Sequence, residues 1–270
     1  MEPDLDSLVG LAQSGDKDAL EDLVGCIQHD IHHLAMRMLV NPEDALDATQ
    51  EILILVVTKL STFAGKSAFK TWLHRVALNY LLGARKVQAR DPGLTFQMFE
   101  EDLERGLVEP ARAVQEDRVL LNELRVSCTM ALLLCLDLKH RAAYLLGFIL
   151  ECSHDEAAEI LGITKANFRK RLSRAREQVE RFTTRACGIA NESAACSCPR
   201  RLPAAMAHHR VAKGRILFSG GDTPAYEDVL DKTRKLEKDL KTLALQRATR
   251  HFDSPRDFGK LIHDIVTIQP

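Results

Sequence analysis

The fold is decided by residues 153–181, which read SHDEAAEILGITKANFRKRLSRAREQVER. Ser153, followed three residues later by Glu156, forms a capping box that marks the start of a helix. That helix ends at Gly162, because glycine permits a tight turn, and a second helix begins at Lys165. Apolar residues recur in the second helix at helical spacing and predict one buried face: Phe168, Leu172, Ala175 and Val179. The pattern predicts a helix-turn-helix.

The remaining surface of the second helix is cationic. Seven basic residues and only two acidic ones lie between Lys165 and Arg181. Such a face suits the phosphates and base edges of a DNA major groove. We therefore predict contacts with duplex DNA from Lys165, Asn167, Arg169, Lys170, Arg171, Ser173 and Arg174. The alternative is a solvated basic face on an ordinary helical hairpin.

The composition of the whole chain is that of a folded, helical protein. Of 270 residues, 46% are hydrophobic and 28% are charged, with a formal net charge of −1. Apolar residues recur every three or four positions and sustained alternation is scarce, which predicts an all-α fold. The longest apolar run is too short for a bilayer span, and the acidic start is unlike a signal peptide. We expect a cytoplasmic protein with no membrane partner.

Breaks in the helical pattern divide the chain. We expect a helical domain at 1–90, a linker at 91–118 with eight acidic residues against three basic ones, a helix-turn-helix domain at 119–186 and a partly helical extension at 187–270. In the extension, capped helices should open at Thr223 and Ser254. One side of a charged helix there should be lined by Val229, Leu236, Leu240 and Leu243. The other helices are expected near residues 16–38, 42–60, 69–86, 118–136, 140–150, 154–161 and 165–182.

A second basic stretch, residues 66–90, holds six basic residues and no acidic one. Phe63, Phe69, Trp72 and Tyr80 are interleaved with these cations. Cations beside aromatic rings suit single-stranded nucleic acid, since phosphates are neutralised while unpaired bases stack. The alternative assigns Phe69 and Trp72 to the core.

The helix that Asn41 is expected to cap begins with an acidic patch, which consists of Glu43, Asp44, Asp47 and Glu51. Carboxylates there complement the helix dipole, which is the structural explanation. Asp47, Gln50 and Glu51 also share one face and could dock a basic protein partner. The sequence indicates no basic neighbour for this patch within the chain.

These pieces, in this order, resemble the extracytoplasmic-function (ECF) group of bacterial RNA polymerase sigma factors. Residues 44–51, 63–79 and 153–176 are similar to the group's polymerase-docking helix, promoter-melting segment and upstream-element reader. The resemblance implies two small helical domains, core RNA polymerase and duplex and melted promoter DNA as partners, and in some systems an anti-sigma protein. It assigns polymerase binding to Asp44, Asp47, Gln50 and Glu51. It assigns promoter melting to Phe63, Lys66, Ser67, Ala68, Trp72, Arg75 and Asn79, and upstream-element binding to the residues of the cationic helix given above.

No motif indicates catalysis or a required cofactor, so we expect no enzyme. His29, His32 and His33 favour a surface cluster over a metal site. Thiolate and imidazole ligands suitable for zinc gather later in the chain, at Cys187, Cys196, Cys198 and His208, with reduced, metal-free thiols as the alternative. A stand-alone helix-turn-helix regulator, responsive to metal or redox state, is the alternative function.

Overall fold

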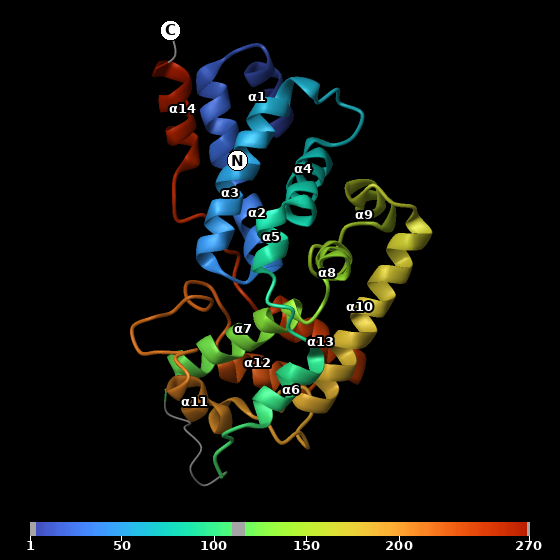
Figure 1. Ribbon diagram of the computed structural model, residues 1–270, viewed down its shortest axis with the longest axis vertical. Coiled ribbons are helices and arrows are strands. Elements are labelled where there is room, and N and C mark those ends of the chain that lie inside the picture. The colour runs from blue at the N-terminus through green and yellow to red at the C-terminus, as the bar shows by residue number, and fades with distance from the viewer. Residues whose placement is uncertain (1–3, 110–116, 269–270) are drawn as a thin grey trace. The chain divides into compact units, whose positions relative to one another are not determined.

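The computed structural model describes residues 4–109 and 117–268, and over these residues the fold is all-α, as predicted (Figure 1). Besides helices, the described residues contain one isolated β-bridge, between Ala212 and Arg215. None of the described helices is both long and apolar enough to cross a bilayer. The elements are α1 (Leu5–Gln13), α2 (Lys17–Leu39), α3 (Pro42–Lys59), η1 (Leu60–Thr62), α4 (Phe69–Gly83), α5 (Arg85–Arg90), α6 (Phe96–Glu104), α7 (Arg118–Leu134), α8 (Leu138–Tyr144), η3 (Leu145–Ile149), α9 (His154–Leu161), α10 (Lys165–Ala186), α11 (Cys198–Ala207), α12 (Tyr226–Arg234), α13 (Lys238–Arg247) and α14 (Phe258–Ile268).

The chain divides into two compact units. Unit 1 comprises the residues up to Arg90, His154–Lys165 and the residues from His251 onward, and unit 2 comprises Asp91–Ser153 and Ala166–Arg250. The predicted extension is thus not a body of its own, because its first part belongs to unit 2 and its end to unit 1. The predicted domain boundaries stay a prediction.

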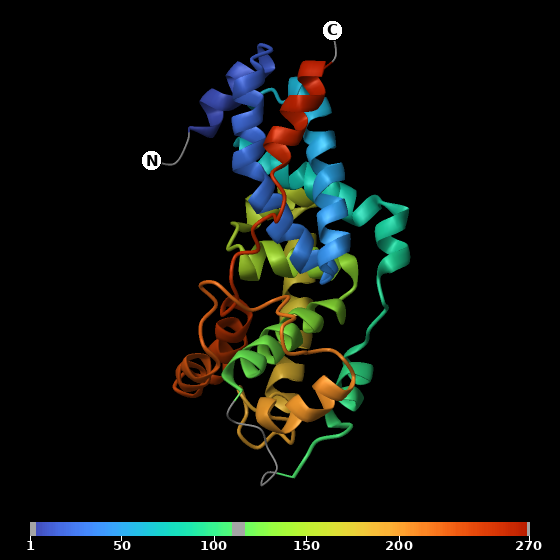
Figure 2. The ribbon, with the colours of Figure 1, turned by 90° about the vertical axis from the view of Figure 1, so that its left-hand side faces the viewer.

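Helices α2 and α3 form the centre of unit 1 and pack against each other. Asp16 caps α2 by accepting the N–H of Ala19 (3.0 Å). Asn41 caps α3, as predicted, by accepting the N–H groups of Glu43 and Asp44 (both 3.0 Å). Helix α14 packs along α2, and Figures 1 and 2 both show it beside the N-terminal helices.

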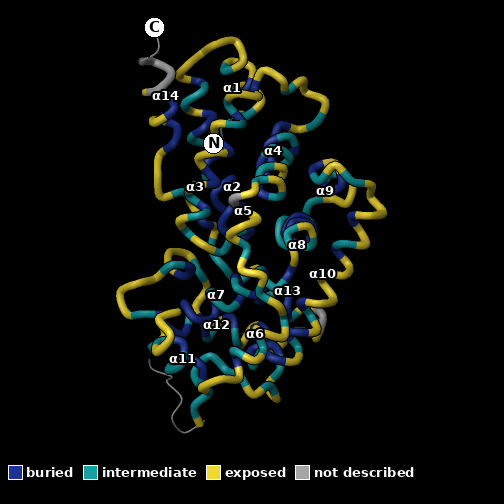
Figure 3. Tube along the Cα trace, viewed as in Figure 1, coloured by how far each residue is buried: buried dark blue, intermediate teal, exposed yellow. Residues whose placement is uncertain are grey.

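The second half of α2, residues 31–38, is buried on every side (Figure 3). A helix at the surface of a domain usually buries one stripe, so burial all round requires several covering elements. Helices α3 and α4 supply part of this cover. The segment that begins at His251 supplies another part, because the ring of His251 stacks on that of His33.

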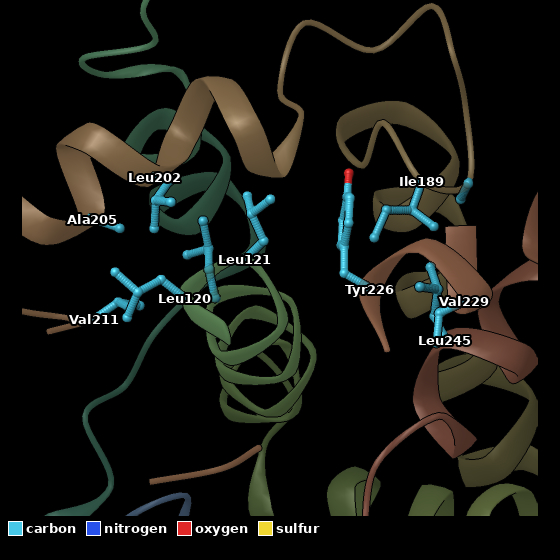
Figure 4. Close-up of a cluster of buried hydrophobic side chains, with 11 residues drawn as sticks. Leu120, Leu121, Ile189, Leu202, Ala205, Val211, Tyr226, Val229 and Leu245 are labelled. Atoms are coloured by element: carbon cyan, nitrogen blue, oxygen red, sulfur yellow. The ribbon is translucent and has the colours of Figure 1, made fainter. Parts of the chain in front are cut away.

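Unit 2 is built around α7. Its apolar cluster joins α7 to residues that the sequence assigned to the extension (Figure 4). Each fully buried leucine side chain in such a cluster contributes about 2 kcal/mol relative to exposure. The cluster contains Leu120, Leu121, Leu124, Ile189, Ala190, Leu202, Ala205, Val211, Tyr226, Val229 and Leu245. Residues 189–245 therefore share a core with α7.

The acidic segment 91–118 is more than a connector, because it contains α6, which Thr95 caps by accepting the N–H of Met98 (3.1 Å). The ring of Phe99 stacks on that of Phe182, with centroids 5.4 Å apart. Asp102 accepts hydrogen bonds from two arginines of the predicted extension: Arg201 (2.9 Å) and Arg210 (2.7 Å). The bond from Arg210 lowers the pKa of Asp102. The acidity of this segment thus neutralises basic side chains of unit 2.

Three predicted helices have different limits. The helix expected at 69–86 is divided at Ala84, whose extended ψ of 123° separates α4 from α5. The charged helix expected around Val229 and Leu240 is divided into α12 and α13, because Glu237 adopts an extended conformation. The helix expected at 140–150 begins earlier, where Asp137 caps α8, and continues as a π-helical turn, η3.

Buried Glu123 of α7 binds the loop around residues 217–219, which belongs to the predicted extension. Its carboxylate accepts the N–H groups of Leu217 (2.9 Å), Phe218 (3.1 Å) and Ser219 (2.7 Å), and its residue is 1% exposed. Changing Glu123→Ala should therefore destabilise unit 2 by about 3 kcal/mol, since three N–H groups lose their acceptor. Urea unfolding followed by circular dichroism measures this loss.

The single tryptophan offers an internal control for that prediction. Trp72 lies in unit 1, so its fluorescence transition should move much less than the dichroism transition. Equal shifts of both transitions, or no shift of either, would contradict a specific role for Glu123 in unit 2.

Candidate nucleic-acid interface

Helix α10 has the two faces that the sequence predicts. Phe168, Leu172, Ala175 and Val179 are all buried. Gly147 of η3 allows the close approach, because a Cβ atom at this position would lie 2.7 Å from Leu172 and 3.0 Å from Phe168. Gly147 of η3 therefore belongs to the surface against which α10 packs. The sequence pattern of α10 alone did not indicate this contact.

The opposite face of α10 carries seven basic side chains from Lys165 to Arg181, and three of them form ion pairs. Lys165 pairs with Asp155 (2.7 Å), Arg176 with Glu180 (3.5 Å), and Arg181 with Glu177. The structure records no ion pair for four other basic side chains of this face, within the described part of the chain: Arg169, Lys170, Arg171 and Arg174. Three of these are exposed and Arg171 is half-buried, while Asn167 and Ser173 are exposed beside them. Most of the residues predicted for duplex DNA thus lie exposed on one face of α10, with Arg171 half-buried and Lys165 ion-paired.

The two helices of the helix-turn-helix are joined at Gly162, which has the left-handed φ of 62° that its predicted turn requires. Helix α9 packs within unit 1 against α4. The chain passes from unit 1 into unit 2 directly after Lys165. The predicted motif is therefore continuous in sequence, with α9 in one unit and nearly all of α10 in the other.

The predicted promoter-melting segment forms an aromatic cluster with an exposed rim. Phe63, Phe69 and Trp72 lie within 5.4–5.6 Å of one another, centroid to centroid. Phe69 is 2% exposed and belongs to the core, which is the structural alternative for this residue. Phe63 and Trp72 are half-buried, so each has an accessible part. The name rim is used for the other predicted residues of this segment that reach the surface: exposed Lys66, Ala68 and Asn79 and half-buried Ser67.

The acidic patch on α3 has a basic neighbour within the chain, which the sequence did not indicate. Arg90 of α5 forms ion pairs with Asp44 and with Asp47, the latter at 3.6 Å. Asp44 is half-buried, whereas Asp47, Gln50 and Glu51 are exposed. The exposed part of the patch is therefore smaller than predicted, and Arg90 partly neutralises it.

Comparisons with known proteins identify the family. The chain matches Sigma-70 region 2 over residues 15–90 and Sigma-70, region 4 over residues 127–179. It is 30% identical over 174 residues to the ECF RNA polymerase sigma factor SigW of Bacillus subtilis, a match that covers 63% of this chain and 91% of SigW. The chain belongs to the ECF sigma factors.

Two other curated relatives, the sigma-H and sigma-E factors, agree with this assignment. The RNA polymerase sigma-H factor of Pseudomonas aeruginosa is 33% identical over 181 residues, covering 64% of this chain and 91% of that protein. The ECF RNA polymerase sigma-E factor of Escherichia coli is 32% identical over 175 residues, with the same coverage. A solved structure of CnrH in complex with the cytosolic domain of CnrY aligns with a TM-score of 0.46 and 23% identity, over 64% of this chain and 92% of that one.

The protein is therefore an alternative sigma factor that directs transcription initiation, and it acts as a DNA-binding factor rather than an enzyme. The predicted function is confirmed. The alternative, a stand-alone helix-turn-helix regulator, is set aside because such a regulator has no need of the region 2 that this sigma factor contains.

One predicted melting residue of the sigma factor is engaged elsewhere. Arg75 donates to the Glu159 side chain (2.8 Å) and to the Glu159 carbonyl (3.2 Å), and Thr71 donates to Glu156 (3.3 Å). Both glutamates belong to α9, which packs on α4. Arg75 would have to leave Glu159 before its charge could meet a phosphate.

The expectation of a surface histidine cluster is wrong. His32 and His33 are 4% and 8% exposed, and Nδ1 of His32 lies 3.1 Å from the Thr49 hydroxyl. Burial and the charge of Arg37 lower the pKa of His33 to about 2, so His33 is neutral. His33 and His29 each accept a backbone N–H from the C-terminal segment, more than two hundred residues away: His33 from Phe252 and His29 from Ser254.

Four cysteines gather in unit 2, but the predicted zinc set is not supported. Cys187, Cys196 and Cys198 line an apolar cavity of about 60 Å³ together with Cys128 of α7. Burial raises the pKa of all four thiols. His208 is exposed and lies near Asp102 instead. Among the residues that the structure describes, no group of three or more His, Cys, Asp or Glu side chains is arranged to hold a metal ion.

Proposed function

We propose that the sigma factor divides promoter recognition between two surfaces, in the cytoplasm and without a cofactor. The exposed face of α10 binds the duplex upstream element, and the rim of the aromatic cluster in unit 1 holds the melted strand. Arg169, Lys170 and Arg174 carry the proposal. Their side chains are exposed and have no ion-pair partner among the described residues, so their charges are available to phosphates and base edges.

The mechanism is selective binding. Opening a duplex costs a few kcal/mol per unstacked step. Contacts that exist only with the open strand offset this cost, and a base that leaves the stack can be held by stacking and by polar groups. Half-buried Phe63 and Trp72 offer ring surface for such a base, and exposed Lys66 and Asn79 offer a charge and an amide beside it.

Transcription with core RNA polymerase and a library of promoter fragments tests the whole proposal. We expect the sigma factor to create start sites that core polymerase alone does not use. Duplex binding without any new start site would contradict it.

Docking to core polymerase is proposed for the exposed side of α3. Carboxylates on a protein surface steer and fix a basic partner. Glu51→Lys should therefore lower the affinity for core polymerase by about tenfold, since it replaces attraction by repulsion. Co-purification with tagged core enzyme, followed by titration, measures the change.

The matched control is Glu43→Lys. Glu43 is exposed on the same helix and undergoes the same change of charge, but it is outside the predicted docking residues. Asp47→Lys is less suitable, because it would also repel Arg90. Equal losses for Glu43→Lys and Glu51→Lys would indicate a general effect of charge and remove the assignment.

A further inference from the structure

The C-terminal segment is fixed to α2 by side chains that accept its backbone N–H groups. Phe252 donates to Nδ1 of His33 (3.0 Å), Ser254 donates to Nδ1 of His29 (3.1 Å), and Phe258 donates to the Gln28 side chain (2.7 Å). Gln28 and His29 are neighbours in α2, and His33 lies one turn later. Side chains of α2 thus satisfy the backbone of an incoming segment, which gives the contact a defined register.

Apolar packing accompanies these hydrogen bonds. Phe252 and Phe258 are 2% and 1% exposed. Gly259 lies so close to α2 that a Cβ atom there would be 2.8 Å from the Glu21 carbonyl oxygen and 3.2 Å from the Gly25 nitrogen. Both neighbouring atoms belong to a helix backbone, which cannot yield as a flexible side chain does. Only glycine fits position 259 while α14 remains seated.

Charged groups border the contact. The ring of His251 stacks on that of His33 with centroids 4.2 Å apart, and its nitrogens lie 3.0 Å from Asp253 and 3.6 Å from Asp30. Hydrogen bonds from His251 and Lys70 contribute to a low pKa of Asp30. Farther along, His263 lies 2.8 Å from Glu21. The segment therefore matches α2 in shape, hydrogen bonding and charge.

This segment lies outside both family-model matches. The region 4 match ends at residue 179, and the match to SigW uses 91% of that protein but only 63% of this chain. Helix α2 lies within the region 2 match, whereas the segment that covers it lies beyond the region 4 match.

We infer that residues 251–264 are a built-in, releasable ligand of α2: they seat on region 2 in one register and cover this surface of α2 while they are seated. A tethered segment competes at an effective concentration in the millimolar range, so a free peptide of the same sequence cannot displace it easily. A chain whose own segment cannot seat should accept that peptide.

The experiment uses full-length protein and a fluorescein-labelled peptide of residues 250–268. Anisotropy should show that the peptide binds the Gly259→Leu chain at least tenfold more tightly than the wild-type chain. Hydrogen exchange at Phe252, Ser254 and Phe258 should be faster in the variant, which verifies release. The same peptide carrying Gly259→Leu should not bind.

Lys260→Leu is the matched control, because it places the same side chain on the exposed position next to Gly259. It should behave as wild type. A second variant, Phe252→Ala with Phe258→Ala, removes both apolar anchors without adding bulk and replaces the first if circular dichroism shows that Gly259→Leu is misfolded. Equal peptide binding by wild type and the released variants overturns the inference.

Discussion

Alanine in place of Arg169, Lys170 and Arg174 together should lower the affinity for duplex promoter DNA by about a thousandfold. Each side chain is exposed, cationic and without an ion-pair partner in the described chain. Loss of one phosphate or base contact costs about 1–3 kcal/mol, and 1.4 kcal/mol corresponds to a factor of ten. The slope of log affinity against log salt should also fall by about 3, because roughly one fewer counterion is released for each lost contact.

The control for this prediction is Arg181→Ala. Arg181 lies on the same helix and is exposed, but its charge is paired with Glu177. It should change duplex affinity by less than twofold. Anisotropy titrations of a labelled promoter duplex at several salt concentrations distinguish the two cases. If Arg181→Ala and the single change Arg174→Ala weakened binding equally, a diffuse basic surface would explain binding better than a defined face.

The faces of α10 could be predicted because local chemistry determines them. Four apolar residues at helical spacing can be buried together on one side only, which leaves the basic residues outside. Asn41 was equally readable, since a cap depends on residues two and three positions away. The all-α fold follows from the same short-range information.

Interactions between distant residues could not be predicted in this way. Arg75 meets Glu159 across 84 positions, and Arg90 meets Asp44 across 46. A charge count shows that both arginines exist, but not that folding brings a carboxylate to each. These two contacts change the predicted interface, because one engages a melting residue and the other neutralises part of the docking patch.

The histidines and cysteines show the same limit at larger separations. His33 looks like a surface residue until a backbone N–H from position 252 is placed against it. Cys128 is 59 positions before Cys187 in the sequence, yet it lines the same cavity as the three later cysteines. The helix-forming pattern around Leu236 was correct as periodicity, but periodicity alone does not reveal that Glu237 turns the chain.

Alanine at Lys66 and Asn79 should impair promoter opening by about tenfold while leaving duplex affinity unchanged. Both side chains are exposed and belong to the predicted melting segment in unit 1, whereas Arg169, Lys170 and Arg174 belong to unit 2. Contacts with an unpaired strand are worth about 1–3 kcal/mol per base, so losing part of them shifts the opening equilibrium by about one decade. Permanganate reactivity of promoter thymines, measured with core polymerase present, reports the open fraction.

Two variants set this result against its alternatives. Lys59→Ala removes an exposed cation of the same unit at the end of α3, outside the predicted segment, and should leave opening unchanged. Arg174→Ala should show the reverse pattern, with weaker duplex binding and little further loss once the template is pre-melted. The proposed division of labour predicts these opposite patterns, because it assigns a different form of the DNA to each surface. Parallel losses of duplex affinity and opening in the Lys66→Ala/Asn79→Ala protein would show that one surface performs both tasks.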